Sequence, residues 1–270
     1  MKRDKSIYIE KYINSGGKNK KIGVSDMESH SLMFELSHPE RLKILNMLKE
    51  KPMRLSHISK MLEVTTAEVS RHLERLGNAR LIERDSESNY NITPFAHIVL
   101  SEVSNFDFLI KNINFFLTHM LSSVPEHLQW FNSMARGGFT EGTLETSSMI
   151  KEASVNAKKF IFVISDEIMR GLVDLDCKKI DEGVLIKKIY PKDAQIPSEY
   201  EKRIGEGFEI RTLKEIPLGL KMSDKIAGVA LRDLHGKVDY SMGMVGEDET
   251  FKEWVGAIFE YYWGKAKPIL

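Results

Sequence analysis

The segment after Thr65 constrains the fold more than any other part of the chain. Thr65 and Glu68 have capping-box spacing, in which each side chain satisfies the other residue's backbone amide. Val69, Leu73 and Leu76 then fall on one narrow stripe of a helix. The opposite face carries small, polar and charged side chains: Ala67, Glu68, Ser70, Arg71, Glu74, Arg75 and Asn78. This pattern predicts a helix that buries one face and offers hydrogen-bonding and cationic groups on the other.

Two helical patterns precede this segment. The first begins at Ser37-His38-Pro39-Glu40, where Ser37 and Glu40 again have capping-box spacing, and it ends before Pro52. The second covers residues 55–62, with Leu55, Ile58, Met61 and Leu62 on one face. Two short helices and a turn before a helix with a polar face predict a helix-turn-helix.

A hairpin pattern follows the helix-turn-helix. Residues 81–84 and 90–92 are strand-like, and the polar residues 85–89 between them form a turn. Thr93-Pro94 then begins another helix, with a cap residue followed by proline. This order predicts a winged helix-turn-helix.

In a helix-turn-helix, the N-terminal end of the second helix enters the major groove. Arg71 is therefore placed to read guanine through O6 and N7, while Arg75, one turn later, is better placed for phosphate. The residues predicted to contact double-stranded DNA are Thr66, Glu68, Ser70, Arg71, Arg75, Ser88 and Asn89.

The stretch from "HPERLKILNMLKE" through "VTTAEVSRHLERLGNARLIERDSESNYNITPFA" resembles the winged helix of the ArsR-type superfamily of regulators. "VSRHLERLGNARLIER" follows the family's pattern from recognition helix to wing. The resemblance implies DNA-binding regulation of transcription. Many members sense metals through cysteine or histidine pairs, but this chain has the single cysteine Cys177, so no metal site and no cofactor are expected.

The charge pattern bears on DNA binding in two opposite ways. Residues 1–25 hold seven Lys/Arg against Asp4 and Glu10, which makes a basic N-terminal arm suited either to phosphate backbone or to plain solvation. Residues 54–95, however, hold six Lys/Arg and six Asp/Glu. Because winged helices also dock proteins, an interaction scaffold stays open as an alternative.

The chain shows no sign of a membrane or secretory route. No apolar run reaches the roughly 18 residues of a membrane span, and "MKRDKSIYIEKY" lacks the apolar core of a signal peptide. The lone Cys177 fits a reducing compartment. We expect a cytoplasmic protein.

Residues 94–121 predict one long amphipathic helix. Its apolar stripe is too rich for a helix exposed alone; it comprises Ile98, Val99, Val103, Phe106, Leu109, Ile110, Ile113, Phe116, Leu117 and Met120. We expect a homodimer through this region, which would present two recognition helices about one DNA turn apart to a palindromic site. An ordinary core helix within one subunit is the alternative.

The C-terminal half alternates strand-like and helix-like runs, which is typical of an α/β fold. Strands are predicted at 159–165, 185–190, 208–213, 226–231 and 238–244, and a closing helix at 248–265. Arg136-Gly137-Gly138 is a possible hinge. The predicted domains are an arm (1–25), a winged helix-turn-helix (26–95), linker and dimerisation helices (96–135) and an α/β effector-binding domain (136–270).

The C-terminal half resembles the phospholipase-D-like effector half of archaeal regulators of the methanogenesis-regulator and TrmB-like families. The resemblance lies in "KKFIFVISDE", "GVLIKKIYPKD", "SEYEKRIGEGFEIR" and "DETFKEWVGAIFEYYWGKAKP". Phospholipase-D enzymes need a His-x-Lys motif, and the corresponding stretch here is Ser223-Asp224-Lys225. Without the histidine nucleophile the domain should bind rather than catalyse. An enzyme with an unrecognised activity is the alternative.

Two further groups of residues are candidates for a site. Asp166-Glu167 and the pair Asp174 and Asp176 have the composition of acid–base pairs, but solvated helix ends explain them better. Ligands of α/β folds bind at strand ends. The residues expected to bind a small-molecule effector are Tyr190, Arg203, Glu206 and Lys225.

Overall fold

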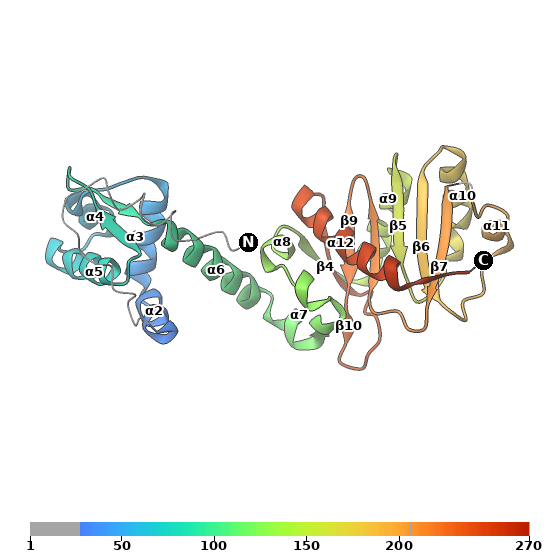
Figure 1. Ribbon diagram of the computed structural model, residues 1–270, viewed down its shortest axis with the longest axis horizontal. Helices are drawn as coiled ribbons and strands as arrows, with labels where there is room; N and C mark the ends of the chain where they lie inside the picture. Colours follow the sequence, from blue (N-terminus) through green and yellow to red (C-terminus); the bar gives the residue numbers. More distant parts are fainter. Residues whose placement is uncertain (1–27, 206, 270) are drawn as a thin grey trace, which may run out of the picture. The chain divides into compact units, whose positions relative to one another are not determined.

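The computed structural model describes residues 28–205 and 207–269. The chain divides into two compact units, with the boundary between Val99 and Leu100 (Figure 1). The predicted basic arm (1–25) and Glu206 lie outside the described residues. No helix in the described part of the chain is long and apolar enough to cross a membrane.

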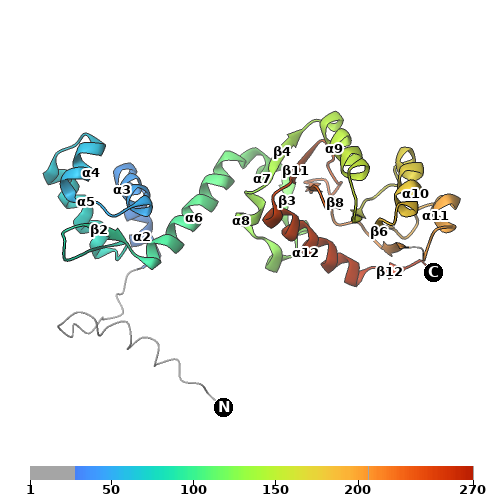
Figure 2. The ribbon, with the colours of Figure 1, turned by 90° about the horizontal axis from the view of Figure 1, so that it is seen from above.

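The first unit is a winged helix-turn-helix, as the sequence predicts (Figure 2). Its core is formed by fully buried residues of successive helices, among them Ile44, Leu45, Ile58, Val69 and Leu76. Its elements are α2 (Ser29–Leu36), α3 (Pro39–Glu50), α4 (Leu55–Leu62), α5 (Thr66–Asn78), β1 (Ile82–Arg84), β2 (Tyr90–Ile92) and the start of α6 (Pro94–Lys111).

The predicted capping box at the start of α3 is wrong. The N-cap residue of α3 is His38, and its side chain makes no capping hydrogen bond. Ser37 instead donates its hydroxyl to the carbonyl of Phe34 at 2.9 Å. The cause is α2, which ends at Leu36 and leaves Ser37 as its C-cap. Met61 also departs from the predicted apolar face of α4, because 52% of its surface is exposed.

The second unit is built on one mixed eight-stranded sheet with the order β12-β7-β6-β5-β8-β9-β11-β4. Strands β5, β6 and β7 are parallel, and every other neighbouring pair is antiparallel. The strands are β4 (Gly138–Glu141), β5 (Phe160–Ile164), β6 (Leu185–Pro191), β7 (Phe208–Leu213), β8 (Gly219–Ser223), β9 (Ala227–Ala230), β11 (Met242–Gly246) and β12 (Lys267–Pro268). Of these strands, β4, β8 and β12 were not predicted from the sequence.

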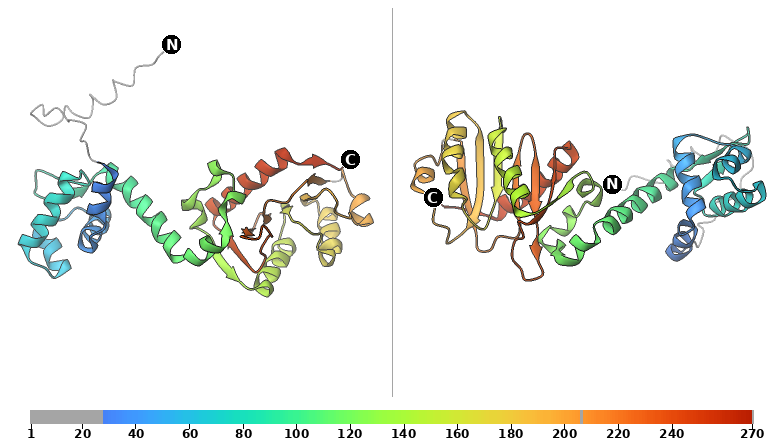
Figure 3. Two further views of the ribbon diagram at one scale, coloured as in Figure 1. Left: turned by 90° about the horizontal axis from the view of Figure 1, so that it is seen from below. Right: turned by 180° about the vertical axis from the view of Figure 1, so that it is seen from behind.

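Helices cover both faces of this sheet (Figure 3). One face packs against α12 (Glu249–Lys265), which Asp248 caps by accepting the amides of Thr250 and Phe251. The other face packs against α9 (Thr143–Val155) and α10 (Val173–Asp181). The remaining elements are α7 (Ile113–Thr118), α8 (Phe131–Met134), α11 (Ser198–Glu201), the 3-10 turns Leu121–Ser123, Glu126–Leu128 and Arg170–Leu172, and a ribbon of β3 (His119–Met120) with β10 (Arg232–Asp233).

Hydrogen bonds fix α9 at both of its ends. Before its first turn, the amide of Gly142 donates to the carbonyl of Ser241 at 2.7 Å. After its last turn, the amides of Lys158 and Lys159 donate to the Asp224 carboxylate at 2.8 and 3.0 Å. The helix is thus tied to the sheet through residues far away in sequence.

The predicted single helix over 94–121 is wrong. It breaks at Asn112, whose φ of −114° and ψ of 27° are not helical. The carbonyl of Phe108 accepts both the backbone amide of Asn112 at 3.2 Å and its side-chain amide at 2.8 Å. Beyond α7, residues 119 and 120 pair with β10 as a strand.

The hinge predicted at Arg136-Gly137-Gly138 and most of the linker predicted at 96–135 are instead parts of the packed second unit. A Cβ on Gly137 would stand 2.6 Å from Cε2 of Phe251, so this glycine allows close packing against α12, and Gly138 begins β4. Phe115, Val124 and Leu128 are buried in the core beneath α12. The second unit therefore begins at Leu100 rather than at residue 136.

Candidate nucleic-acid interface and ligand pocket

The start of α5 has the geometry that its sequence predicts. The Thr65 hydroxyl accepts from the amide of Glu68 at 3.2 Å, which satisfies one of the free amides in the first turn. Val69, Leu73 and Leu76 are at most 2% exposed. These contacts fix which face of α5 points to solvent.

The outward face of α5 is open. Thr66, Ser70 and Arg71 are all exposed. Within residues 28–205 and 207–269, no hydrogen bond or ion pair holds the Arg71 guanidinium. Its donors are therefore available for a ligand, and the groove contacts of these side chains stay predictions.

Arg75, by contrast, is held by its own chain. Its Nη2 and Nε donate to the two carboxylate oxygens of Glu35 at 2.7 and 2.9 Å, and its guanidinium lies 5.1 Å from the centre of the Phe34 ring. The buried Arg41 donates its Nε to the backbone carbonyl of Glu35 at 2.6 Å, and the same nitrogen lies 3.2 Å from the Glu35 carboxylate. The predicted phosphate contact of Arg75 stays a prediction, and it has to compete with this pair.

We expect Glu35→Gln to loosen the packing of α2 on α5. Its hydrogen bonds to Arg75 and the charges of both arginines lower the pKa of Glu35. The ionised form therefore stabilises the fold above its ordinary pKa, and that contribution is lost as the pH falls through the lowered value. At pH 7 the substitution should cost about 1–3 kcal/mol, because it leaves Arg41 without a charged partner.

Hydrogen exchange of α2 and α5 amides in the full chain measures this effect, since it resolves one unit from the other. Glu74→Gln removes a carboxylate from the exposed face of α5 and is the matched control. Equal exchange rates in the two variants at pH 7 would show that the pair does not stabilise the unit.

His72 is packed and does not read bases. It is 8% exposed, and its ring centre lies 4.6 Å from that of His38. Neither ring nitrogen has a hydrogen-bond partner in the described part of the chain. Burial lowers the pKa of His72, with a further contribution from the neighbouring His38. A neutral ring at pH 7 follows.

The wing turn is ordered by one carboxylate. Asp85 accepts the amides of Glu87 and Asn89 at 2.9 and 2.8 Å, and its other oxygen accepts the side-chain amides of Asn89 and Asn91. These hydrogen bonds lower the pKa of Asp85. Ser88, with a φ of 69°, turns the chain at the tip. Ser88 and Asn89 are half-exposed, and their contacts with DNA stay predictions.

The predicted effector residues do not come together. Tyr190 lines a cavity, whereas Arg203 pairs with Asp181 at the surface and Lys225 lies beside Asp224 at 3.4 Å with half of its side chain exposed. Glu206 is outside the described residues. Of the three that the structure describes, only Tyr190 thus lies near a place where a small molecule fits.

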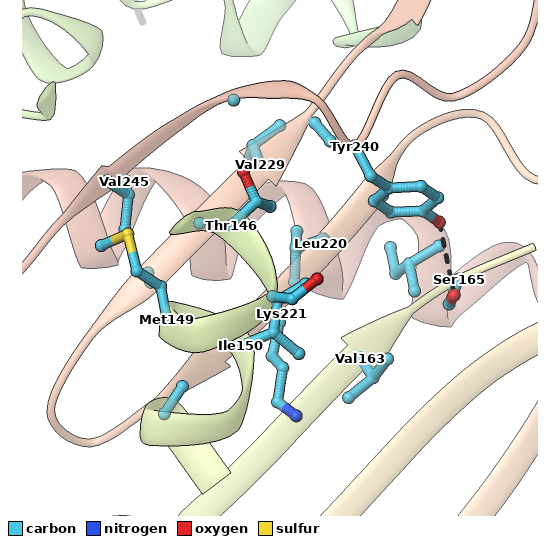
Figure 4. Close-up of a pocket in the computed structure, with 18 of the residues that line it drawn as sticks. Thr146, Met149, Ile150, Val163, Ser165, Leu220, Lys221, Val229, Tyr240 and Val245 are labelled. Carbon is cyan, nitrogen blue, oxygen red and sulfur yellow. Dashed lines mark hydrogen bonds between the residues drawn. The ribbon is translucent and has the colours of Figure 1, made fainter. Parts of the chain in front are cut away.

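That cavity, of about 300 Å³, lies between α9 and the sheet (Figure 4). Its walls are mainly apolar, with Met149 and Ile150 from α9 facing Val163 and Val229 from the sheet. Its polar side chains come from several strands and loops: Thr140, Thr146, Ser147, Ser165, Glu167, Lys188, Tyr190, Lys221 and Tyr240. The Tyr240 hydroxyl lies 3.3 Å from the Ser165 hydroxyl and donates to Asp166 at 2.6 Å.

A buried ion pair borders the cavity. Asp176 is fully buried and accepts from both Lys188 and Tyr200, and Lys188 also donates to the Tyr200 hydroxyl at 2.8 Å. The interpretation of Asp174 and Asp176 as solvated is therefore wrong for Asp176, although Asp174 is exposed. The sequence signal for this network was Lys188, which together with Lys187 interrupts the apolar residues of β6.

Ser223, which stands where phospholipase-D enzymes have the histidine of their His-x-Lys motif, has a structural role. Ser223 is fully buried, and its hydroxyl accepts the amides of Lys225 and Ile226 at 3.2 and 3.4 Å. Ser223 therefore stabilises the turn between β8 and β9.

Several solved structures are similar to this chain. That of TrmBL2, described as an archaeal chromatin protein with a novel mode of DNA binding, is 17% identical, with a TM-score of 0.43 over 90% of this chain and 100% of that one. NucT from Helicobacter pylori is 8% identical, with a TM-score of 0.39 over 47% of this chain and 92% of that one. Nuc from Salmonella typhimurium, a phospholipase D family member, is 11% identical, with a TM-score of 0.38 over 49% and 97%.

The sequence comparisons concern the first unit alone. No curated protein matches the chain. Residues 38–84 match the family described as "Bacterial regulatory protein, arsR family". The matched segment runs from the start of α3 to the end of β1, and so contains both helices of the helix-turn-helix and the first strand of the wing. Residues 38–84 are therefore an ArsR-type helix-turn-helix domain, which supports a DNA-binding regulator of transcription.

Proposed function

We propose that this protein is a cytoplasmic homodimer that regulates transcription by binding double-stranded DNA, and that its second unit senses a small molecule. The observation that carries the proposal is Arg71, exposed and without a hydrogen bond or ion pair to any residue that the structure describes, beside Ser70 on the capped second helix of an ArsR-type domain. A helix that reads DNA needs these side chains exposed to solvent, whereas in a structural helix the rest of the protein would bury them.

The contacts with DNA divide into two classes. Thr66, Ser70 and Arg71, with Glu68 next to them, face the base edges, where Arg71 binds guanine through two hydrogen bonds. Arg75 and the wing residues Ser88 and Asn89 lie further along and contact the backbone, which positions the domain. The basic arm (1–25) adds to the phosphate contacts, which offsets the balanced charge of residues 54–95.

Arg71→Ala is expected to lower sequence discrimination about 5- to 150-fold, because a bidentate contact to guanine contributes about 1–3 kcal/mol of it. Fluorescence anisotropy with the upstream DNA of the protein's own gene and with a scrambled duplex, at several salt concentrations, measures the ratio of affinities. Arg136→Ala removes an exposed arginine of the second unit and is the matched control. Unchanged discrimination in Arg71→Ala would show that α5 does not lie in the groove as proposed.

The dimer is proposed on an exposed apolar surface of α6 and α7. Five large apolar side chains of these helices are more than half exposed, and exposed apolar surface of this kind marks interaction sites; they are Ile98, Phe106, Ile110, Ile113 and Leu117. A twofold axis through this surface would pair two recognition helices, so that both read one palindromic site.

The second unit is proposed to bind rather than to catalyse. The buried Ser223 replaces a histidine nucleophile, and the cavity beneath α9 has the apolar walls and few polar groups of a small-molecule site. A ligand there changes the affinity for DNA only if the DNA-bound and free forms bind it with different affinities.

A further inference from the structure

The floor of the cavity carries two lysines on one face of the sheet. The register pairs Val163 of β5 with Lys221 of β8 on one side and with Lys188 of β6 on the other. Side chains of paired residues point to the same face, so both ammonium groups project toward α9 and α10. Figure 4 shows Lys221 near Ile150 and Val163.

The two lysines differ in their partners. Lys188 is compensated by the carboxylate of Asp176 and the hydroxyl of Tyr200. Lys221 has no hydrogen bond or ion pair within residues 28–205 and 207–269. The three charges therefore leave one positive charge in surplus beside an apolar cavity. Glu167, the carboxylate among the lining residues, is exposed at the rim.

Glycine provides the space next to Lys221. In the register, Lys221 pairs with Gly228 of β9, which then pairs with Val245 of β11. A Cβ on Gly228 would meet its nearest neighbour, the carbonyl of Met244, at 3.4 Å, an ordinary contact, so a side chain would fit at this position. Its absence leaves that volume to the cavity.

The unpaired charge is costly in this environment. Burial is the main cause that lowers the pKa of Lys221, to about 8; the charge of Asp176 opposes this shift, and the charge of Lys188 adds to it. A negative group beside Lys221 would offset this cost. The apolar wall from α9, with Met149 and Ile150, meanwhile suits a hydrocarbon rather than a sugar or a nucleotide.

We propose that the cavity beneath α9 binds a small amphipathic monocarboxylate, whose carboxylate contacts Lys221 and whose apolar body lies against Met149 and Ile150. One surplus positive charge matches one negative charge, which favours a carboxylate over a doubly charged phosphate ester. The inference rests on the proposed sensing role, because it gives the chemical class of the signal.

Calorimetric titration of the full chain tests the inference. The probes are hexanoate, octanoate, decanoate and phenylacetate, with octan-1-ol and octyl phosphate as neutral and doubly charged counterparts. We expect at least one carboxylate to bind, and octanoate to bind more tightly than octan-1-ol and octyl phosphate. Lys221→Met should weaken carboxylate binding about tenfold or more, because the lost contact involves two charged groups. Lys214→Met removes an exposed lysine outside the cavity and should leave binding unchanged.

Gly228→Val is a second variant, which fills the cavity while keeping Lys221. It should abolish binding and leave the folded state intact, as far-ultraviolet circular dichroism reports. Binding by none of the four carboxylates would overturn the inference, as would equal affinities for octanoate and octan-1-ol, tighter binding of octyl phosphate, or wild-type binding by Lys221→Met.

A separate arm distinguishes this inference from the proposed function. DNA affinity is measured with and without the carboxylate that binds most tightly. If the carboxylate binds in the cavity but DNA affinity does not change, the ligand class is supported and the sensing role is wrong. If the protein binds no DNA at all, the regulator proposal fails while the calorimetric result stands.

Discussion

The double variant Phe106→Glu, Ile110→Glu is expected to be a monomer and to bind its DNA site about 100-fold or more weakly than the wild type. Both side chains are more than half exposed on α6, so the substitutions should not disturb the fold of one chain. Across a twofold axis, they place like charges where apolar surface would be buried. Joining two DNA-binding domains raises apparent affinity by about 10²–10⁴, and this gain is lost in a monomer.

Sedimentation velocity measures the mass, and fluorescence anisotropy with a palindromic duplex measures the affinity. Leu234→Glu is the matched control, because Leu234 is an exposed leucine of the second unit that lies outside α6 and α7. A double variant that still sediments as a dimer would place the dimer contact elsewhere, and a wild-type monomer at micromolar concentration would rule out the proposed dimer.

Asp176→Ala should destabilise the second unit by about 3–5 kcal/mol, because it leaves Lys188 charged and buried without its partner. Lys188 is 4% exposed and Asp176 is fully buried, so water cannot replace the lost carboxylate. The charge of Asp176 helps to raise the pKa of Lys188 above its ordinary value. Lys188 is therefore a charged ammonium in the folded protein.

Urea unfolding followed by tryptophan fluorescence measures this change. Asp174→Ala is the matched control, since Asp174 is exposed on the same helix two residues earlier. The double variant Asp176→Leu, Lys188→Met should recover much of the stability, because two apolar side chains replace a buried pair. Equal costs for Asp176→Ala and Asp174→Ala would contradict the expectation.

Several local patterns predicted the structure correctly, although the capping box at Ser37 and the single helix over 94–121 did not. The cap at Thr65, the stripe of Val69, Leu73 and Leu76, the wing turn and the closing helix near 248–265 are all local patterns. Each of them involves residues within a few positions of one another, so periodicity and capping rules suffice.

Contacts across the chain could not be predicted in this way. Asp174 and Asp176 look alike in the sequence, and only the packing of α10 on the sheet buries the second. The pair of Arg75 with Glu35 spans 40 residues. Lys221 lies in β8, where a glycine and a lysine interrupt the apolar residues, so that the strand was not recognised from the sequence. Its position across β5 from Lys188 depends on the strand order β6-β5-β8.

The anchoring of α9 at both ends has a consequence for exchange kinetics. Gly142 is hydrogen-bonded to Ser241, and the loop after the helix is hydrogen-bonded to Asp224. Helix α9 therefore cannot move away from the sheet to open the cavity without losing those hydrogen bonds. A ligand must instead pass between side chains, so its association depends on its cross-section. We expect its dissociation to be slow compared with that from a site closed by a free loop.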